Sequence, residues 1–133
     1  MFPVIELPPG GVGLQWVYNR VRDHLLKQKV RAHDGSSCVY RGPDNTACAA
    51  GCLIRDDLYD PIFEGHSVGY GWEGLDDAIT ESLNLKLGDN ITPENKDLLL
   101  KAVGDLQVIH DRGGPDTWNE QLRRFAEIRG LVP

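Results

Sequence analysis

Apolar side chains recur at every third or fourth position along four stretches of the chain, and this spacing predicts amphipathic helices. The first helix is expected over residues 14–31, and its apolar face consists of Leu14, Val17, Tyr18, Val21 and Leu25. Basic residues gather near the end of this stretch, where they complement the helix dipole. The turn formers Asp34-Gly35-Ser36 are expected to follow the helix directly.

Three further helices are expected in the second half of the chain. One covers residues 75–86. The next begins with Thr92 as N-cap and Pro93 in the first helical position, and it is the most clearly marked of the set. In the last, the spacing of Thr117 and Glu120 fits a capping box.

Residues 37–54 interrupt the helical pattern. Two short strands, expected over 38–41 and 47–54, flank the turn formers Gly42-Pro43-Asp44-Asn45, so the segment predicts an antiparallel hairpin. The second strand is rich in small residues that allow a helix or a ligand to approach closely. These residues are Ala47, Ala49, Ala50 and Gly51.

These elements predict an α+β fold that is mostly helical, with three to four helices packed around a short antiparallel β-hairpin. A chain of 133 residues suits a single domain, 1–133. Residues 1–13 are interrupted by proline and glycine, and we expect them to form an extended N-terminal arm.

Composition limits the cellular location and the kinds of partner that we expect for the chain. No apolar run is long enough for a transmembrane helix, and the N-terminus lacks the basic start and apolar core of a signal peptide, so a cytoplasmic protein is expected. The net charge of −6 disfavours general nucleic-acid binding, which needs cations to neutralise phosphates. Three cysteines in such a chain indicate reduced thiols rather than a disulfide framework.

The cysteines raise the question of a metal site. Cys38, Cys48 and Cys52, with His33 upstream, offer four ligands of the kind that zinc prefers. Their spacing matches no standard zinc finger, and buried cysteines commonly serve as small apolar side chains. We therefore favour packing in the core and expect neither a metal nor a cofactor.

Two kinds of catalytic chemistry are alternatives. Cys48 or Cys52 paired with His110, and oriented by Asp111, would form the minimum of a cysteine hydrolase. Both cysteines lie in an apolar segment, where a thiol is unreactive. Carboxylates for a metal-dependent hydrolase occur in two clusters, Asp56-Asp57 with Asp60 and Asp76-Asp77 with Glu73, without the spacing of an established metal motif.

A small-ligand pocket is expected beside the hairpin and in the glycine-rich loop that follows it. The candidate ligand-binding residues are Tyr40, Arg41, Arg55, His66, Tyr70 and Trp72. Aromatic rings stack on bases and arginine binds phosphates, so this set suits a nucleotide or another small anion. The loop glycines match no established phosphate-binding motif.

A protein-binding surface is the remaining possibility. Trp16 lies off the main apolar face of the first helix, and Trp118 opens the last one. Tryptophan on a surface is a typical interface anchor. The sequence leaves open whether these rings face a partner or the core, and it also leaves open whether the chain forms a homo-oligomer.

Several segments resemble short proteins of bacteriophage and prophage genomes. These segments are Cys38-Val39-Tyr40-Arg41-Gly42-Pro43-Asp44, Cys48-Ala49-Ala50-Gly51-Cys52-Leu53-Ile54, Asp57-Leu58-Tyr59-Asp60-Pro61, Glu64-Gly65, and Leu106-Gln107-Val108-Ile109-His110-Asp111 with Trp118 and Leu122. The resemblance implies a host bacterial cytoplasm as the setting and carries over no activity and no functional residue.

The function expected from the sequence is therefore non-enzymatic. The chain is expected to be a phage-type accessory protein that binds and inhibits a host protein, with a host defence protein as one candidate. One alternative is a sponge that sequesters a nucleotide signal molecule, and another is a cysteine- or metal-dependent hydrolase.

Overall fold

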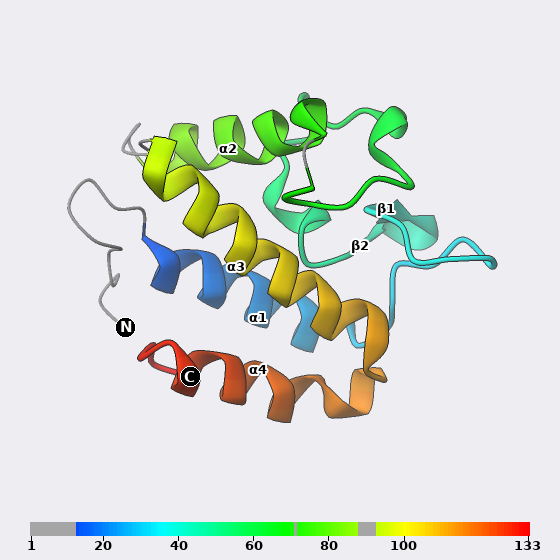
Figure 1. Ribbon diagram of the computed structural model, residues 1–133. Helices are drawn as coiled ribbons and strands as arrows, with labels where there is room; N and C mark the ends of the chain where they lie inside the picture. The colour runs from blue at the N-terminus through cyan, green and yellow to red at the C-terminus, as the bar shows by residue number, and fades with distance from the viewer. Residues whose placement is uncertain (1–12, 71, 88–92) are drawn as a thin grey trace.

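The computed structural model describes residues 13–70, 72–87 and 93–133, and it contains four α-helices and a two-stranded sheet (Figure 1). The helices are α1 (Leu14–Gln28), α2 (Glu73–Leu87), α3 (Pro93–Arg112) and α4 (Trp118–Ile128). The strands are β1 (Arg41–Gly42) and β2 (Thr46–Ala47). The mostly helical α+β fold predicted from the sequence is confirmed.

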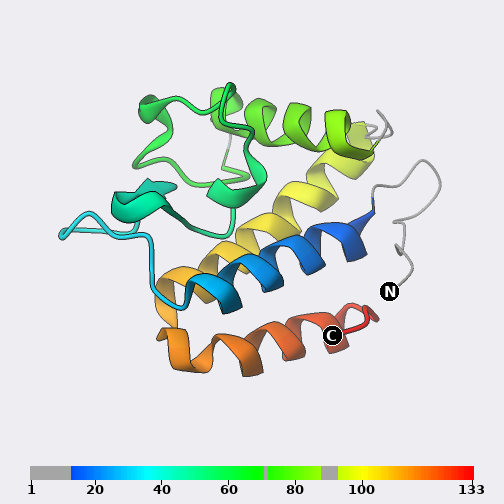
Figure 2. The same cartoon turned by 180° about the vertical axis from the view of Figure 1, so that it is seen from behind.

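Helix α1 forms the centre of the fold, between α3 and α4 (Figures 1 and 2). Its predicted apolar face is buried along its whole length, and Val17, Val21 and Leu25 are fully enclosed. The Tyr18 ring stacks on Phe125 of α4, with the ring centroids 5.9 Å apart. The burial of this continuous apolar stripe is the main source of stability for a helix of this length.

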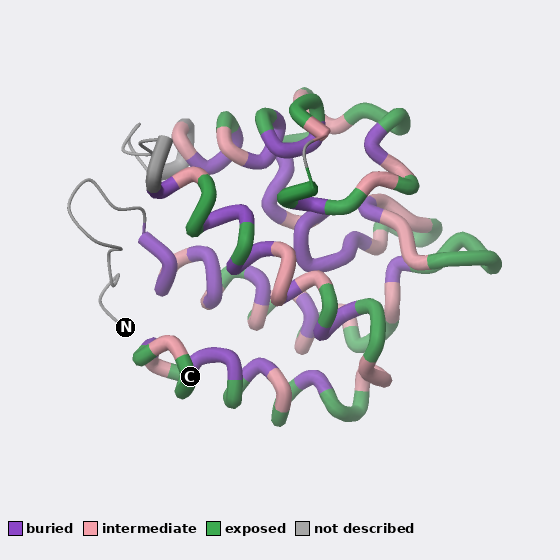
Figure 3. The backbone as a smooth tube through the Cα atoms, viewed as in Figure 1, coloured by how far each residue is buried: buried purple, intermediate pink, exposed green. Residues whose placement is uncertain are grey.

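Helix α2 lies on the other side of the molecule and contacts a short 3-10 helix, Gly51–Leu53, which also packs against α1. Figure 3 shows buried positions facing inward along all four helices, whereas the tip of the segment before β1 is exposed. The small residues 47–51 are thus part of the core, because they allow α1 to approach closely.

The hairpin is shorter than predicted. Its strands pair antiparallel, with Arg41 opposite Ala47 and Gly42 opposite Thr46. The turn is tight because Asp44 and Asn45 both have positive φ, at 58° and 61°. Beyond Ala47 the expected second strand is replaced by turns and the 3-10 helix, so the prediction of a strand reaching residue 54 was wrong.

The end of α1 and the cap of α4 differ from the sequence prediction. Helix α1 ends at Gln28 because Lys29 adopts the left-handed conformation and its N–H bonds to the Leu25 carbonyl. The capping box before α4 is wrong, because the Thr117 hydroxyl donates to the Gly114 carbonyl instead. The predicted N-cap Thr92 lies outside the described residues, as does the arm up to residue 12.

The buried amide of Gln15 fixes the end of the chain to α1. Its Oε1 accepts from the backbone N–H of Val132 at 2.8 Å, and its Nε2 donates to the Val132 carbonyl at 2.8 Å. The segment after α4 is thereby held beside the start of α1. Within the part of the chain that the structure describes, no helix is long and apolar enough to cross a membrane.

Candidate functional site

A pocket with a volume of about 990 Å³ lies among the described residues. One wall is the exposed face of α3 from Asp97 to Arg112, and the opposite wall is made by the segments 34–40 and 64–70. The segment 64–70 lies over the middle of α3, where Val68 approaches Gly104, and the segment 34–40 lies toward the carboxyl-terminal end of the helix, where Cys38 is close to Asp111 (Figure 1). We call this pocket the α3 groove.

Two carboxylates hold the loop wall of the α3 groove in place. Glu64 accepts hydrogen bonds from the backbone N–H groups of Tyr40 (2.8 Å) and Arg41 (3.2 Å), and from the Tyr59 hydroxyl (2.6 Å). Asp76, at the start of α2, accepts from the backbone N–H of Gly69 at 2.9 Å. The wall is therefore preorganised by hydrogen bonds that link it to the hairpin and to α2.

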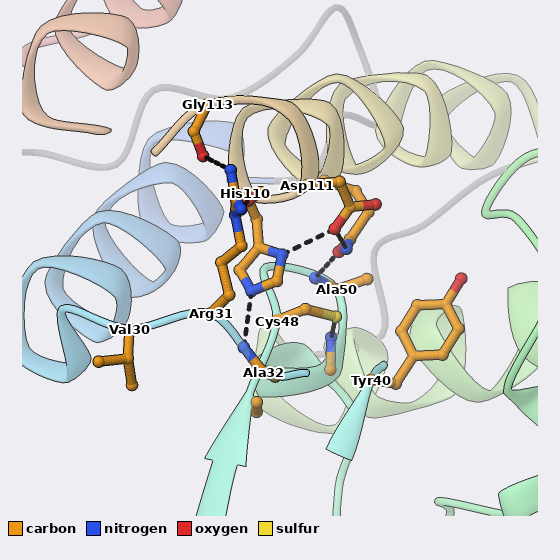
Figure 4. Close-up of polar contacts among 12 residues, drawn as sticks. Val30, Arg31, Ala32, Tyr40, Cys48, Ala50, His110, Asp111 and Gly113 are labelled. Carbon is orange, nitrogen blue, oxygen red and sulfur yellow. Dashed lines mark hydrogen bonds and ion pairs between the residues drawn. The ribbon is translucent and has the colours of Figure 1, made fainter. Parts of the chain in front are cut away.

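At one end of the groove, Cys38 meets His110 and Asp111 from the last turn of α3. One ligand-type atom from each of these side chains lies within 4.8 Å of the other two, and this is the only such group among the described residues. His110 is fully buried and its Nδ1 lies 2.7 Å from Asp111 Oδ1, as Figure 4 shows. This cluster is therefore the candidate for metal or acid–base chemistry among the described residues.

The hydrogen bonds of His110 define its tautomer. The backbone N–H of Ala32 donates to His110 Nε2 at 3.1 Å, so Nε2 carries no proton. The neutral ring then has its proton on Nδ1 and donates it to Asp111. Both ring nitrogens are therefore used inside the fold, and His110 is not free to act as a base toward Cys38.

The same tautomer works against a metal ion at this cluster. A histidine that binds a metal normally donates its other ring N–H to an acceptor. Here the other nitrogen faces a donor, the Ala32 N–H, so binding a metal through Nδ1 would break that buried hydrogen bond. Cys38 and Asp111 alone are too few ligands for a zinc site, which takes at least three from the protein.

The Cys38 thiol is also poorly suited to be a nucleophile. Burial raises its pKa, and the neighbouring Asp111 carboxylate raises it further, which outweighs the opposite effect of Arg31. A reactive cysteine needs the reverse, a positive environment that lowers the thiol pKa. The thiol faces the groove as a protonated group.

Cys48 and Cys52 do not join Cys38. Burial raises the pKa of both thiols, that of Cys52 to about 12. Cys48 Sγ accepts from the Gly51 N–H, and Cys52 Sγ donates to the Ala49 carbonyl. They pack in the protein, as the sequence interpretation favoured, and neither they nor His33 form a metal-ligand group with Cys38.

The predicted ligand-binding residues divide into two groups. Tyr40, His66 and Tyr70 line the α3 groove. Tyr40 is buried and donates its hydroxyl proton to the His66 carbonyl, whereas Tyr70 is 86% exposed at the edge of the groove. The groove thus brings together half of the predicted set.

The other three predicted residues lie outside the groove lining. The Arg41 guanidinium bonds to the carbonyls of Gly51 and Ile54 and to the Asp56 carboxylate. Arg55 pairs with its neighbour Asp57 at 3.0 Å. The Trp72 ring stacks on His66 and packs against the core.

The acidic clusters predicted from the sequence also have structural partners. Asp56 and Asp57 form the ion pairs with the two arginines, and Asp60 accepts from the Ile62 N–H at the start of a 3-10 helix. Asp77 pairs with Lys96 of α3 at 2.8 Å. No group of these carboxylates is close enough to hold a metal among the described residues.

The two tryptophans considered as interface anchors are not equally accessible. Trp118 is fully buried and stacks on His110, with centroids 5.4 Å apart, so it is part of the core. Trp16 is partly buried against the same core. Of the two orientations that the sequence left open, the Trp118 ring therefore has the one that faces the core.

Sequence reasoning missed the α3 wall of the groove. Its lining positions recur at helical spacing on the polar face of α3: Asp97, Lys101, Gly104, Val108 and Asp111. A glycine within this polar stripe was the available signal, because it leaves the face open where Val68 approaches.

Comparison of the chain with known protein families, with curated proteins and with solved structures gives no match.

Proposed function

We propose that this chain is a non-enzymatic accessory protein of the phage type, which binds and inhibits a host protein in the bacterial cytoplasm through the α3 groove. The observation that carries the proposal is the groove itself. It has a volume of about 990 Å³ and a loop wall preorganised by Glu64 and Asp76. A preformed pocket of this size is a typical binding site.

The chemistry at the end of the groove favours binding over catalysis. His110 uses both ring nitrogens within the fold, and the Cys38 thiol has a raised pKa. A cysteine hydrolase would need the pair to share a proton, with the thiolate favoured. Cys38 and His110 therefore offer neither an activated nucleophile nor a free base at this end of the groove.

The nucleotide-sponge alternative loses its phosphate ligands. Arg41 and Arg55 point their guanidinium groups to carbonyls and carboxylates outside the groove. The groove lining has two cationic side chains, Lys101 and Arg112, against six acidic ones, and this net negative charge disfavours phosphate. The acidic residues are Asp34, Glu64, Asp76, Asp97, Asp105 and Asp111. A protein partner fits the site better than a small anion.

The groove edge supports a protein partner for a second reason. Tyr70 is 86% exposed and Val108 is 48% exposed, and both line the groove. Exposed tyrosine is a frequent contributor to binding energy in protein interfaces. Together they offer an apolar contact beside the polar groups of the two walls.

A capture experiment with matched variants tests the proposal. The immobilised full chain is exposed to lysate of a bacterial host, in parallel with Tyr70→Ala, Gly104→Leu and a control, Ile128→Ala, which removes an exposed apolar side chain of α4. We expect one host protein to bind the wild type and the control, and to bind the groove variants about thirtyfold more weakly. Equal retention on all four proteins, or no specific retention, would contradict the proposal.

A further inference from the structure

Six carboxylates but only two lysine or arginine side chains line the α3 groove, and exposed carboxylates and exposed cations both occur among them. Asp76 is 7% exposed and Glu64 is half-buried, and both accept hydrogen bonds rather than facing a cation. The cationic side chains in the lining, Lys101 and Arg112, are exposed. Charges lining a concave surface focus their field into the cleft.

Two titratable groups of the groove lining have shifted pKa values, for different reasons. Hydrogen bonds from Ser37 and Ser36 lower the pKa of Asp34, which keeps that carboxylate charged. Burial raises the pKa of the Tyr40 hydroxyl, and nearby acidic groups, including Asp111 and Glu64, raise it further. A positive charge entering the groove would meet attraction from both walls.

We propose that the occupant of the α3 groove is a lysine- or arginine-bearing segment of the partner protein. This inference rests on the proposed binding function and names the chemistry of the partner. A long cationic side chain matches the site in two ways, because its head meets the carboxylates and its aliphatic stem meets Tyr70 and Val108 at the edge.

Arginine also suits the aromatic edge. A guanidinium stacks on tyrosine faces, and Tyr70 is exposed enough to accept such a contact without rearranging the core. Within the lining, Asp34 and Asp97 are exposed carboxylates on opposite walls, one in the segment 34–40 and the other on α3. Their positions allow a segment that lies along the groove to contact both.

Peptide titration tests this inference directly. The full chain is titrated by calorimetry with a short peptide that alternates arginine and glycine, and with the matching glutamate–glycine peptide. We expect binding of the arginine peptide only, and binding about tenfold weaker when the salt is raised from about 50 mM to about 500 mM. Equal binding of the two peptides, or of neither, would overturn the inference.

Charge variants locate the binding. The double variant Asp34→Asn with Asp97→Asn keeps the amide oxygen that the turn at residue 34 needs, and removes two groove charges. The control, Asp23→Asn with Asp57→Asn, removes the same net charge outside the groove. We expect about tenfold weaker peptide binding for the groove variant and no change for the control. Equal affinities for the two variants would overturn the inference.

Two further readouts exclude other occupants and separate this inference from the proposed function. If free arginine binds as tightly as the peptide, the occupant of the groove is a small cation. If the chain self-associates and the groove variant abolishes this, the occupant is a second copy of the chain. The last readout repeats the host capture with Gly104→Leu, with added arginine peptide and with the charge variant. If Gly104→Leu abolishes capture but the peptide and the charge variant do not weaken it, the proposed function stands and the cationic segment is contradicted.

Discussion

The backbone N–H of Ala32 donates a hydrogen bond to Nε2 of His110 across 3.1 Å inside the core. This contact ties the segment after α1 to the last turn of α3. Arg31 strengthens the same link, since its guanidinium bonds to the carbonyls of His110 and Gly113 (Figure 4). The imidazole at the end of the α3 groove is thus a structural group that positions one wall of the groove.

Replacing His110 should therefore destabilise the protein. In His110→Ala the Ala32 N–H loses its buried acceptor and Trp118 loses its stacking partner. We expect a loss of about 3 kcal/mol in the free energy of unfolding, measured by urea denaturation. The exposed His33 provides the control, and His33→Ala should change stability by less than about 0.5 kcal/mol. Similar effects of the two variants would contradict a structural role for His110.

Two glycines should respond oppositely to the same substitution. A Cβ at Gly51 would lie 2.0 Å from the Tyr40 carbonyl oxygen, so the backbone would have to move. We expect Gly51→Ala to cost about 3 kcal/mol of stability. A Cβ at Gly104 would lie 3.6 Å from the Val68 carbonyl oxygen, which is ordinary contact. Gly104→Ala should stabilise α3 by about 0.5–1 kcal/mol.

Thermal denaturation of the two variants measures this contrast. A Gly51→Ala protein as stable as the wild type would show that the Gly51 backbone does not approach Tyr40 as closely as described. Destabilisation by Gly104→Ala would show that α3 and the loop wall are packed more tightly than an open groove allows.

The three cysteines should differ in accessibility, and all three thiols should react slowly with alkylating reagents. Cys48 is fully buried and Cys52 is half-buried, and burial raises the pKa of each thiol, that of Cys52 to about 12. Cys38 is half-buried at the groove, and burial and Asp111 raise its pKa. In native protein at neutral pH, iodoacetamide should alkylate Cys38 alone, more slowly than a free thiol, as followed by mass spectrometry. Rapid alkylation of Cys38 would indicate an activated thiolate and revive the hydrolase alternative.

Stability should fall on the acid side of neutral pH because of His24. Burial lowers the pKa of His24 below its usual 6.5, and its Nε2 contacts the Ala47 carbonyl at 2.8 Å. The unfolded chain then binds a proton more readily than the folded one. The contribution of His24 is complete above its unfolded pKa and is lost as the pH falls through the lower folded pKa.

Melting curves between about pH 7 and about pH 5 measure this effect. The His24→Gln variant keeps a side chain that can donate to Ala47 and removes the titration, so its melting temperature should decline less over this range than that of the wild type. An identical decline in both proteins would assign the acid sensitivity to other groups.

The helices could be predicted from the sequence because the spacing of apolar residues that indicates a helix lies within the helix itself. The apolar stripe from Leu14 to Leu25 repeats at helical spacing, and the structure buries it as predicted. The strand expected up to residue 54 failed because an apolar run of small residues fits a buried turn as well as a strand. The close approach of Gly51 to Tyr40, which decides between the two, depends on tertiary packing.

The candidate site was less accessible to sequence reasoning. Its walls come from three segments, 34–40, 64–70 and the polar face of α3, and no local pattern indicates that they meet. Tyr70 was predicted to bind a ligand because of its aromatic ring, and it lines the groove. Arg41 was chosen for its charge, and that charge is used by the Ile54 carbonyl and Asp56.

The most direct test of the account is a map of where a cationic segment binds. Isotope-labelled full-length protein is titrated with the arginine–glycine peptide while backbone amide signals are followed by NMR. A cationic segment bound in the α3 groove should perturb signals in the segments 34–40 and 64–70 and on the polar face of α3, and leave those of the exposed face of α4 unchanged. Perturbations confined to α4, or none at saturating peptide, would contradict it.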